Sequence, residues 1–461
     1  MSTLATRTPR TRQRFVLIGL LFVHSVNTIM DRVAISAARD PIMQDLGIND
    51  QMMGYIFGIF ALGYALFQIP SGWFADRFGP RKALTWVVSI WSTFTMLTGA
   101  AWNAASMLVL RFLFGAGEAG AFPGATRAFY RWLPVRERGM AHGINFSGTR
   151  LGGAIALFLI PGMIALVGWR WTFVINGFLG IVWAAAWLLW FRDEPRDNAK
   201  INAAEVEYIE EGQAEDFGGE DKGTFGQIFT SSNMLLAMYQ YFAGNVTFFV
   251  TYTWLLPYLT DTWGQTAAIY APLPLLMGAA GNLASGSLVT GLYKRGYAVA
   301  SRRVPAIIGF LLGTVGLVLA TQLDGLGPFI IVFSIAIFGV DMTLSPSWAF
   351  CMDIGGDKSG AVSASMNMVG NLGSAMSAVL FPFFVASVTI PGLVPATGSA
   401  NSFFIFCAVL NVIAVGAWLL MNPNRPVDTS RTPEQVRLRV IAFGVLLFAG
   451  TTGLILYNLF F

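Results

Sequence analysis

The stretch Gly72-Trp-Phe-Ala-Asp76-Arg77-Phe-Gly79-Pro-Arg81-Lys82 connects two long apolar runs of the sequence. Its residues predict the end of one helix, a tight turn and a basic start to the next helix. Gly72 would let a neighbouring helix approach closely, and Gly79 would permit the turn. Asp76 can accept hydrogen bonds from the N-terminus of a facing helix. The remaining charges favour the cytoplasmic side of a membrane, and they are Arg77, Arg81 and Lys82. Taken alone, the stretch is most simply interpreted as a basic cytoplasmic turn.

The composition indicates that lipid is the main surrounding of this chain. Of its 461 residues, 55% are apolar and only 12% are charged, about half the charged fraction of an average soluble domain. Apolar runs of about 20 residues recur along the sequence, and each can cross ~30 Å of hydrocarbon. The net charge of +4 is spread along the chain, which argues against nucleic-acid binding. The two cysteines, Cys351 and Cys407, show neither metal-ligand spacing nor a disulfide framework.

The apolar runs predict a series of membrane-spanning helices. They are expected near residues 15–37, 52–75, 82–102, 105–130, 140–168, 170–191, 234–259, 267–293, 302–322, 326–351, 359–388, 398–421 and 438–461. A polar stretch, 192–230, separates the first six spans from the next six, and residues 203–213 within it have acidic helical character. The expected regions are a basic cytoplasmic N-terminus (1–14), an N-terminal six-helix bundle (15–191), a cytoplasmic loop (192–233), a C-terminal six-helix bundle (234–424), and a linker with an extra transmembrane helix (425–461).

The two predicted bundles carry matching short motifs. Asn145-Phe-Ser-Gly148 at the fifth span corresponds to Asn367-Met-Val-Gly370 in the eleventh, and Ser71-Gly72 corresponds to Ser285-Gly286. Parallel repeats of six spans, with a binding site between them near the middle of the membrane, are an arrangement of transporters. The repeat therefore favours a polytopic all-α transporter.

Lys and Arg residues gather in alternate connections, which orients the chain. They precede the first span and follow the second, fourth, eighth and twelfth, whereas the alternate connections on the other side are nearly free of Lys and Arg, with Arg39 and Arg170 as the exceptions. The N-terminus is therefore expected in the cytoplasm, with the chain in a cell inner membrane and its C-terminus on the opposite side. Residues 440–461 carry no charge and would form a helix about 33 Å long. They predict a thirteenth span, the alternative being a tail that lies along the membrane.

Ionisable residues inside predicted spans are costly and mark candidate functional sites. Here they include Asp31, Arg32, Arg111 and Glu118. Arg111 and Glu118 are two helical turns apart and share one face. Such a pair can neutralise itself, and protonation of Glu118 would release Arg111 for an anionic substrate, which would couple protons to anions. The alternatives are a static structural ion pair for Arg111 and Glu118, and an interfacial pair for Asp31 and Arg32.

The full spacing of residues 72–82 resembles the signature loop of the major facilitator superfamily. Three more segments are similar to its anion:cation symporter family, namely Asp31-Arg-Val-Ala-Ile-Ser, Gly63-Tyr64-x3-Gln68-Ile-Pro-Ser-Gly-Trp-Phe and Arg111-Phe-Leu-Phe-Gly-Ala-Gly-Glu118-Ala-Gly-Ala-Phe-Pro123. The resemblance covers about residues 15 to 425. It implies the major facilitator fold of two six-helix bundles and proton-coupled uptake of an organic anion, such as a sugar acid or another small carboxylate, by alternating access.

The resemblance also implies roles for individual residues. Asp31 and Glu118 would be proton sites, and Arg111 would hold Glu118 and help to couple protons to the anion. Arg32 would meet the substrate carboxylate, and residues 72–82 would form a gating motif. The residues expected to bind the substrate are Arg32, Tyr64, Arg111 and Asn367. Protons would be the coupling ion, no cofactor or metal is implied, and the carrier would function as a monomer.

Further candidates are polar residues of the spans or departures from the sugar-acid permeases, and they are His24, Asn27, Thr149, Arg150, Tyr252, Asp341 and Asn371. Thr149 stands where galactonate-like carriers place a Gln. Arg150 is either a second anion anchor or a side chain that reaches the cytoplasmic face. Asp341 is either an extra proton site or the partner of another donor. His24 can relay protons, although packing is the preferred interpretation.

Two other functions fit the same sequence. An anion exchanger or uniporter would use the same fold without proton coupling, and a membrane sensor would bind its ligand without transport. An enzyme does not fit, because the sequence has no His-Glu-x-x-His site, nucleophile elbow or nucleotide-binding loop.

Overall fold

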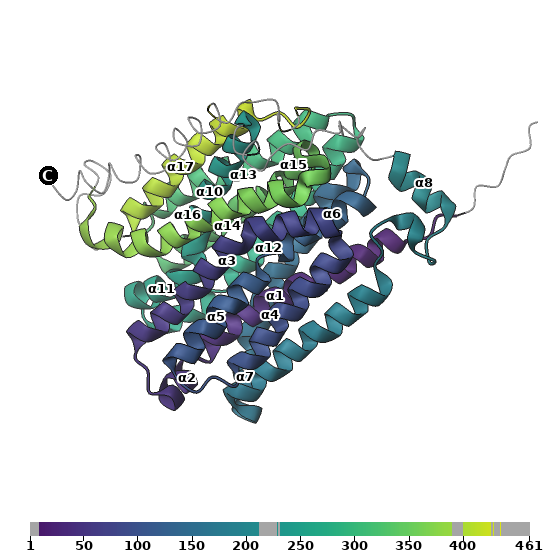
Figure 1. Cartoon of the computed structure of the whole chain (residues 1–461). Helices are drawn as coiled ribbons and strands as arrows, with labels where there is room; N and C mark the ends of the chain where they lie inside the picture. Colours follow the sequence, from purple (N-terminus) through teal and green to yellow (C-terminus); the bar gives the residue numbers. More distant parts are fainter. Residues whose placement is uncertain are drawn as a thin grey trace, which may run out of the picture. The chain divides into compact units, whose positions relative to one another are not determined.

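The computed structural model describes residues 9–211, 231–389 and 400–425, and the single residues 228, 427 and 434. These residues form helices and short connections (Figure 1), as expected for an all-α membrane protein. The chain divides into two compact units. Unit 1 comprises Met1–Phe217 and Gly356–Ala364, and unit 2 comprises Gly218–Gly355 and Ser365–Phe461.

The first part of the chain supplies most of unit 1, drawn in purple through blue to teal in Figure 1. Its described helices are α1 (Gln13–Ala37), α2 (Arg39–Leu46), α3 (Asp50–Phe78), α4 (Pro80–Thr98), α5 (Ala104–Glu118), α6 (Ala121–Trp132), α7 (Val135–Trp190), the 3-10 helix η1 (Pro195–Asp197) and α8 (Ala203–Glu211).

The described helices of the second part are α10 (Ser232–Thr253), α11 (Leu255–Trp263), η2 (Gln265–Tyr270), α12 (Leu273–Lys294), α13 (Ala298–Ala320), α14 (Leu326–Met342), α15 (Leu344–Gly355), η3 (Gly356–Lys358), α16 (Ser359–Ser387) and α17 (Asn401–Leu420). All of them belong to unit 2 except η3 and the first turns of α16, up to Ala364, which belong to unit 1.

Local sequence signals explain where several helices of unit 1 begin. The side chain of Asn49 accepts a hydrogen bond from the backbone N–H of Met52 and caps α3. Asn103 and Ser106 form a capping box at the start of α5. Pro80 occupies the first turn of α4, where its missing N–H costs no helical hydrogen bond.

Several predicted spans are interrupted in the structure. The span expected at 105–130 breaks at Ala119–Gly120, between α5 and α6, so that Glu118 is the last residue of α5. Similar breaks divide the spans expected at 234–259 and 326–351. The spans expected at 140–168 and 170–191 are joined as α7, which turns sharply at Gly168 (φ 75°, ψ 163°).

Arg170 and Asp45 form an ion pair beside this turn in unit 1. Arg170 Nη2 lies 3.0 Å from Asp45 Oδ2, and Nη1 donates to the carbonyls of Gly99 (2.9 Å) and Ala101 (2.6 Å). These partners neutralise an arginine that departs from the alternating charge pattern of the loops. The same guanidinium ties α2 and the connection after α4 to α7.

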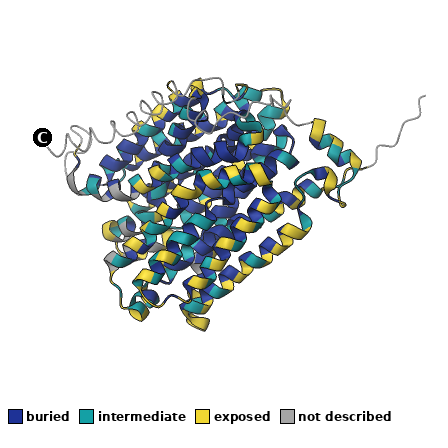
Figure 2. Cartoon of the chain, viewed as in Figure 1, coloured by how far each residue is buried: buried dark blue, intermediate teal, exposed yellow. Residues whose placement is uncertain are grey.

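Large apolar side chains are exposed along the outer faces of the helices. On the second half of α7 they include Trp171, Phe178, Leu179, Val182 and Leu189, and Figure 2 shows exposed residues along this helix. Eight described helical stretches are long and apolar enough to cross a membrane. Apolar surface of this extent suits hydrocarbon rather than water, and the chain is a multi-pass membrane protein. The predicted thirteenth span lies outside the described residues.

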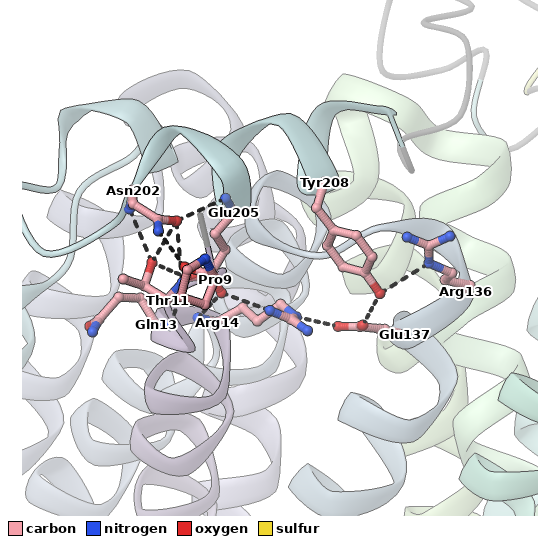
Figure 3. A network of polar contacts seen from close by, with 9 residues as sticks. All are labelled: Pro9, Thr11, Gln13, Arg14, Arg136, Glu137, Asn202, Glu205 and Tyr208. Atoms are coloured by element: carbon pink, nitrogen blue, oxygen red, sulfur yellow. Dashed lines mark hydrogen bonds and ion pairs between the residues drawn. The ribbon is translucent and has the colours of Figure 1, made fainter. Parts of the chain in front are cut away.

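The short helix α8, within the polar stretch predicted to have helical character, caps α1 (Figure 3). Glu205 is fully buried, and its carboxylate accepts hydrogen bonds from the backbone N–H groups of Gln13 (3.0 Å) and Arg14 (3.2 Å). The same carboxylate pairs with Arg14 Nη1 at 2.8 Å. Because the side chain of the N-cap residue Arg12 makes no capping hydrogen bond, Glu205 supplies an acceptor that the first turn of α1 needs.

Tyr208 of α8 joins this network to the start of α7, as Figure 3 shows. Its hydroxyl donates to Glu137 Oε1 at 2.5 Å and accepts from Arg136 Nε at 3.1 Å. The other oxygen of Glu137 lies 2.8 Å from Arg14 Nε. The helix after the sixth predicted span is therefore bound to the first turns of both α1 and α7.

Candidate functional site

Two glycines bring α3 and α5 into close contact. A Cβ atom on Gly63 would lie 2.3 Å from the carbonyl oxygen of Phe112, and one on Gly115 would lie 2.2 Å from that of Phe60. Neither position can carry a larger residue without moving the opposite backbone. This close approach sets Phe60 and Tyr64 of α3 against the face of α5 that carries the buried charges.

Glu118 forms its ion pair with α1. The carboxylate is fully buried, and Oε1 accepts a hydrogen bond from Arg32 Nε at 2.8 Å. The guanidinium of Arg32 also lies over the ring of Tyr64, with Cζ 4.5 Å from the ring centroid. The sequence analysis expected Arg111 to hold Glu118. The structure instead gives this role to Arg32, whose side chain reaches from α1 to the last residue of α5.

Arg111 forms no ion pair within 4.0 Å among the described residues. Its Nε atom is buried and has no hydrogen-bond partner in the same part of the chain. The guanidinium lies beside two rings that also contact each other, with Cζ 5.1 Å from the centroid of Phe60 and 4.6 Å from that of Phe114. The Phe60 ring also lies 5.3 Å from Cζ of Arg32, so one aromatic ring contacts both cations.

Asp31 lies beside Arg32 on α1 and is 1% exposed. Its Oδ2 atom accepts a hydrogen bond from Trp91 Nε1 of α4 at 3.2 Å. The other oxygen, Oδ1, is buried and has no hydrogen-bond partner among the residues that the structure describes.

Asp31, Arg32, Arg111 and Glu118 are called the α1–α5 cluster below. Each member keeps at least one buried polar atom without a hydrogen-bond partner in the described chain, and these atoms are Asp31 Oδ1, Arg32 Nη2, Arg111 Nε and Glu118 Oε2. Buried polar groups are nearly always satisfied in folded proteins. Several unsatisfied groups in one cluster indicate a place where a proton, water or an anion binds.

His24 and Asn27 lie on α1 on the N-terminal side of Asp31. His24 is 1% exposed, and its ring centroid lies 4.9 Å from that of Trp183 and 5.3 Å from that of Trp91. Asn27 is buried, and a Cβ atom on Gly180 would come within 3.1 Å of its Nδ2. The surroundings of His24 fit the packing interpretation.

Thr149 and Arg150 are both buried in α7. Thr149 Oγ1 donates to the carbonyl of Phe146 at 2.6 Å and accepts from Arg150 Nη1 at 3.3 Å. The two departures from the sugar-acid permeases therefore contact each other.

In unit 2, Asn371 Nδ2 donates to the backbone carbonyl of Asn367 at 2.8 Å and to its side-chain oxygen at 3.2 Å. The two asparagines thus form one polar patch on α16. Trp348 Nε1 donates to the hydroxyl of Tyr241 at 3.0 Å, a pair that the sequence analysis did not foresee.

The other two candidates of unit 2 lie in different surroundings. Tyr252 is 38% exposed and packs edge-on against Phe248 at 4.9 Å. Asp341 is buried near the end of α14.

The stretch 72–82 contacts the start of α16 within unit 1. Asp76 accepts hydrogen bonds from the backbone N–H groups of Gly360 (2.9 Å) and Ala361 (2.7 Å), in the first turn of α16, where N–H groups lack an intrahelical acceptor. A Cβ atom on Gly72 would lie 2.6 Å from that of Ala364. These are the close approach and the helix-end contact that the sequence predicts.

The turn at the end of the stretch also has a partner. Gly79 has a φ of 80°, which favours glycine, and the N–H of Arg81 donates to Asp193 Oδ1 at 2.8 Å. Burial raises the pKa of Asp193, although Arg81 opposes this shift. Arg77 lies over the ring of Trp73 at 5.3 Å, and Lys82 is exposed.

Arg127 and Asp357 extend this contact. Arg127 Nη2 lies 2.9 Å from Asp357 Oδ1, and its Nε lies 3.7 Å from Asp76 Oδ1. The sequence analysis did not select either residue. Arg127 stands four residues before Arg131 in the same basic helix, and that spacing was the available signal.

Comparisons with known proteins agree with this architecture. The family model of the Major Facilitator Superfamily matches residues 20–378. A Cupriavidus necator protein named "Probable sulfoacetate transporter SauU" is 31% identical over 426 residues, covering 91% of this chain and 96% of that protein. A Bacillus subtilis protein named "Probable galactarate/D-glucarate transporter GudP" is 30% identical over 438 residues, covering 89% and 92%.

Among solved structures, the major facilitator proton:xylose symporter XylE, bound to 6-bromo-6-deoxy-D-glucose, matches with a TM-score of 0.67. Its sequence identity is 14%, and the match covers 92% of this chain and 98% of that one, so it shows the fold alone. The names of the sequence relatives agree with the sugar-acid permeases that the motifs resemble. The chain therefore belongs to the major facilitator superfamily, and it is a transporter rather than an enzyme.

Proposed function

We propose that this chain is a proton-coupled symporter that takes up a small organic anion by alternating access. One observation carries the proposal, namely that Arg111 is buried in the α1–α5 cluster without a carboxylate partner among the described residues. A buried guanidinium needs an anion. Since Glu118 is held by Arg32, a substrate carboxylate is the partner that suits Arg111.

The second step of the proposal concerns the proton. With both acids ionised, the α1–α5 cluster contains two negative and two positive charges. A proton on Glu118 removes its charge and weakens the pair with Arg32, which leaves a second guanidinium for the anion. The proton and the substrate charge then offset each other, and the loaded site costs less to enclose in a low-dielectric environment. Asp31, beside Arg32, would be the second proton site.

The substrate class follows from the charges and the relatives together. The names of the two relatives described above refer to transport of sulfoacetate and of galactarate or D-glucarate. These compounds are anions with acidic groups at both ends. Two arginines can hold such acids, or a sugar acid with one carboxylate. Within unit 1, Tyr64 beside Arg32 is suited to a substrate hydroxyl. In unit 2, the family resemblance supports the same role for Asn367.

Orientation and gating complete the proposal. We place the N-terminus in the cytoplasm of a cell inner membrane, since Lys and Arg gather in alternate connections. The contact of Asp76 with the first turn of α16 would then lie on the cytoplasmic side and act as a latch that opens and closes during transport.

Purified protein in proteoliposomes tests the proposal. With an inward proton gradient, the vesicles should accumulate D-glucarate, galactarate or sulfoacetate, and a protonophore should abolish accumulation. Asp31→Asn and Glu118→Gln should lose this uptake, whereas Asp40→Asn, at an exposed carboxylate, should keep it. Accumulation by both acid variants at the wild-type level would overturn the proposal. Uptake without pH dependence would indicate an exchanger or uniporter, and binding without flux would indicate a sensor.

A further inference from the structure

We infer that Trp91 is a positioning residue, which fixes the carboxylate of Asp31 and thereby sets the pH range in which this acid exchanges its proton. The role of Trp91 in transport rests on the proposed function. The contact of Trp91 with Asp31 rests on the structure alone.

The contact between the two residues is well enclosed. Trp91 is fully buried, and Asp31 is 1% exposed. The indole Nε1 donates to Oδ2 at 3.2 Å, which leaves Oδ1 as the oxygen without a partner in the described chain. A carboxylate held by one oxygen has a fixed direction and presents the other oxygen for protonation.

Neighbouring groups hold the indole in place. The imidazole of His24 packs edge-on against it, with centroids 5.3 Å apart and planes at 61°. On the backbone side, a Cβ atom on Gly117 would lie 3.2 Å from Trp91 N. Gly117 directly precedes Glu118. Trp91 therefore binds one acid of the cluster through its side chain and abuts the residue before the other acid through its backbone.

The indole N–H can only donate a hydrogen bond. Such a donor favours the ionised carboxylate over the protonated acid. Removal of the N–H should let Asp31 keep its proton to higher pH, by about one pH unit for one hydrogen bond to a charged group.

Arg111 and Glu118 of α5 act electrostatically on Asp31, and Arg32 is its neighbour in the sequence. The other titratable groups on its helix and on the helices nearby are His24 of α1, Tyr64 of α3 and Arg150 of α7, whose Gly152 packs against α1 at Val26. The substitution of Trp91 leaves all of these groups unchanged, so a shift of the pH profile would report the lost N–H.

Infrared difference spectroscopy of the purified protein is the decisive experiment. The carboxylic C=O band that disappears in Asp31→Asn belongs to Asp31, and its intensity is followed from pH 4 to pH 10 in wild type and Trp91→Phe. The expected result is a midpoint about one pH unit higher in Trp91→Phe. An unchanged midpoint would overturn the inference.

Trp183→Phe is the matched control. Trp183 contacts the same imidazole, at 4.9 Å, and its N–H also donates to α1, but to the carbonyl of Leu20 at 2.8 Å. Its replacement should leave the midpoint unchanged, and an equal shift in both variants would make the effect one of packing and overturn the inference. Should Trp91→Phe fail to fold, 3-benzothienylalanine at position 91 keeps the indole shape without the N–H and serves in its place.

Transport measurements distinguish failure of the role inferred for Trp91 from failure of the proposed symport. With labelled D-glucarate, Trp91→Phe should slow net uptake by at least threefold, because proton release slows, and it should keep exchange at equal pH near the wild-type rate. If wild type takes up none of the tested anions, the proposed function fails while the infrared result still decides the role of Trp91. Equal loss of net uptake and exchange would count against positioning.

Discussion

Arg32 Nε and Glu118 Oε1 lie 2.8 Å apart, although the two residues belong to different helices and are 86 positions apart in the sequence. This ion pair uses one of the two acids and one of the two arginines of the α1–α5 cluster. Arg111, on the same helix as Glu118, is left with aromatic neighbours. The two arginines therefore have different surroundings, since Arg32 is paired with an acid and Arg111 lies beside aromatic rings.

Arg111→Gln should weaken anion binding by at least about thirtyfold, because loss of one partner of a buried charge contact costs ~2–5 kcal/mol. Arg111→Lys should restore only part of the affinity, since it keeps the charge but not the planar donor set. Binding of D-glucarate and sulfoacetate is measured by calorimetry. Arg39→Gln, at a half-exposed side chain, is the control, and wild-type affinity in Arg111→Gln would contradict the assigned role.

Removal of one partner of the Arg32–Glu118 pair should cost more stability than removal of both. Glu118→Gln leaves Arg32 without its counter-charge, at a cost of about 3–5 kcal/mol. The double variant Arg32→Gln, Glu118→Gln should recover at least half of that loss, because no buried charge of the pair remains. Unfolding in detergent at neutral pH measures the four free energies of wild type, Arg32→Gln, Glu118→Gln and the double variant. Additive losses in the double variant would mean that the two side chains do not interact.

Gly360→Ala should impair both stability and uptake. The added Cβ would lie 2.6 Å from Asp76 Oδ1 and 2.9 Å from the carbonyl oxygen of Gly72, and such overpacking costs ~1–3 kcal/mol. Gly416→Ala is the matched control, since its Cβ would meet nothing within 4 Å. Thermal unfolding and uptake rates are measured for both. A harmless Gly360→Ala would show that the contact of Asp76 with α16 tolerates separation.

The stabilising effect of Tyr208 should disappear at high pH. Burial and the hydrogen-bonded Glu137 raise the pKa of Tyr208 above its usual value. The folded protein therefore holds the phenolic proton more tightly than the unfolded chain. The resulting stability is complete below pH ~10, the unfolded value, and is lost as the pH rises through the folded value.

The melting temperature of Tyr208→Phe, compared with wild type from pH 7 to pH 11, tests this expectation. The difference should stay constant up to about pH 9 and shrink above it. Tyr297→Phe, at an exposed tyrosine, is the control. A difference that grows with pH would have the wrong sign for a phenol that donates to a carboxylate.

The charged residues of the site could be predicted because they interrupt apolar spans. Asp31 and Glu118 stand out in a sequence with so few charges, and Asp76 stands out through the spacing of its loop. The family resemblance then supplied their expected roles. The general architecture followed from the length and alternation of the apolar runs.

The partners of these residues could not be predicted in the same way. The spacing of Arg111 and Glu118 places them on one face of a helix, but which arginine reaches Glu118 depends on how α1 packs against α5. Phe60 and Trp91 are aromatic residues in apolar spans and look like ordinary core residues in the sequence. Their contacts with the charges appear only when four helices, α1, α3, α4 and α5, are brought together.

The hydrogen bonds of Glu205 to the first turn of α1 bear on how the gene can be divided. Co-expression of two half-transporters is a common way to study carriers of this kind, and the polar stretch after the sixth span is the obvious place for the cut. A cut between residues 192 and 202 would put Glu205 and Tyr208 on the wrong polypeptide and leave the amino end of the first half uncapped. A cut beyond residue 211 would keep α8 and its hydrogen bonds to α1 and α7 within one fragment.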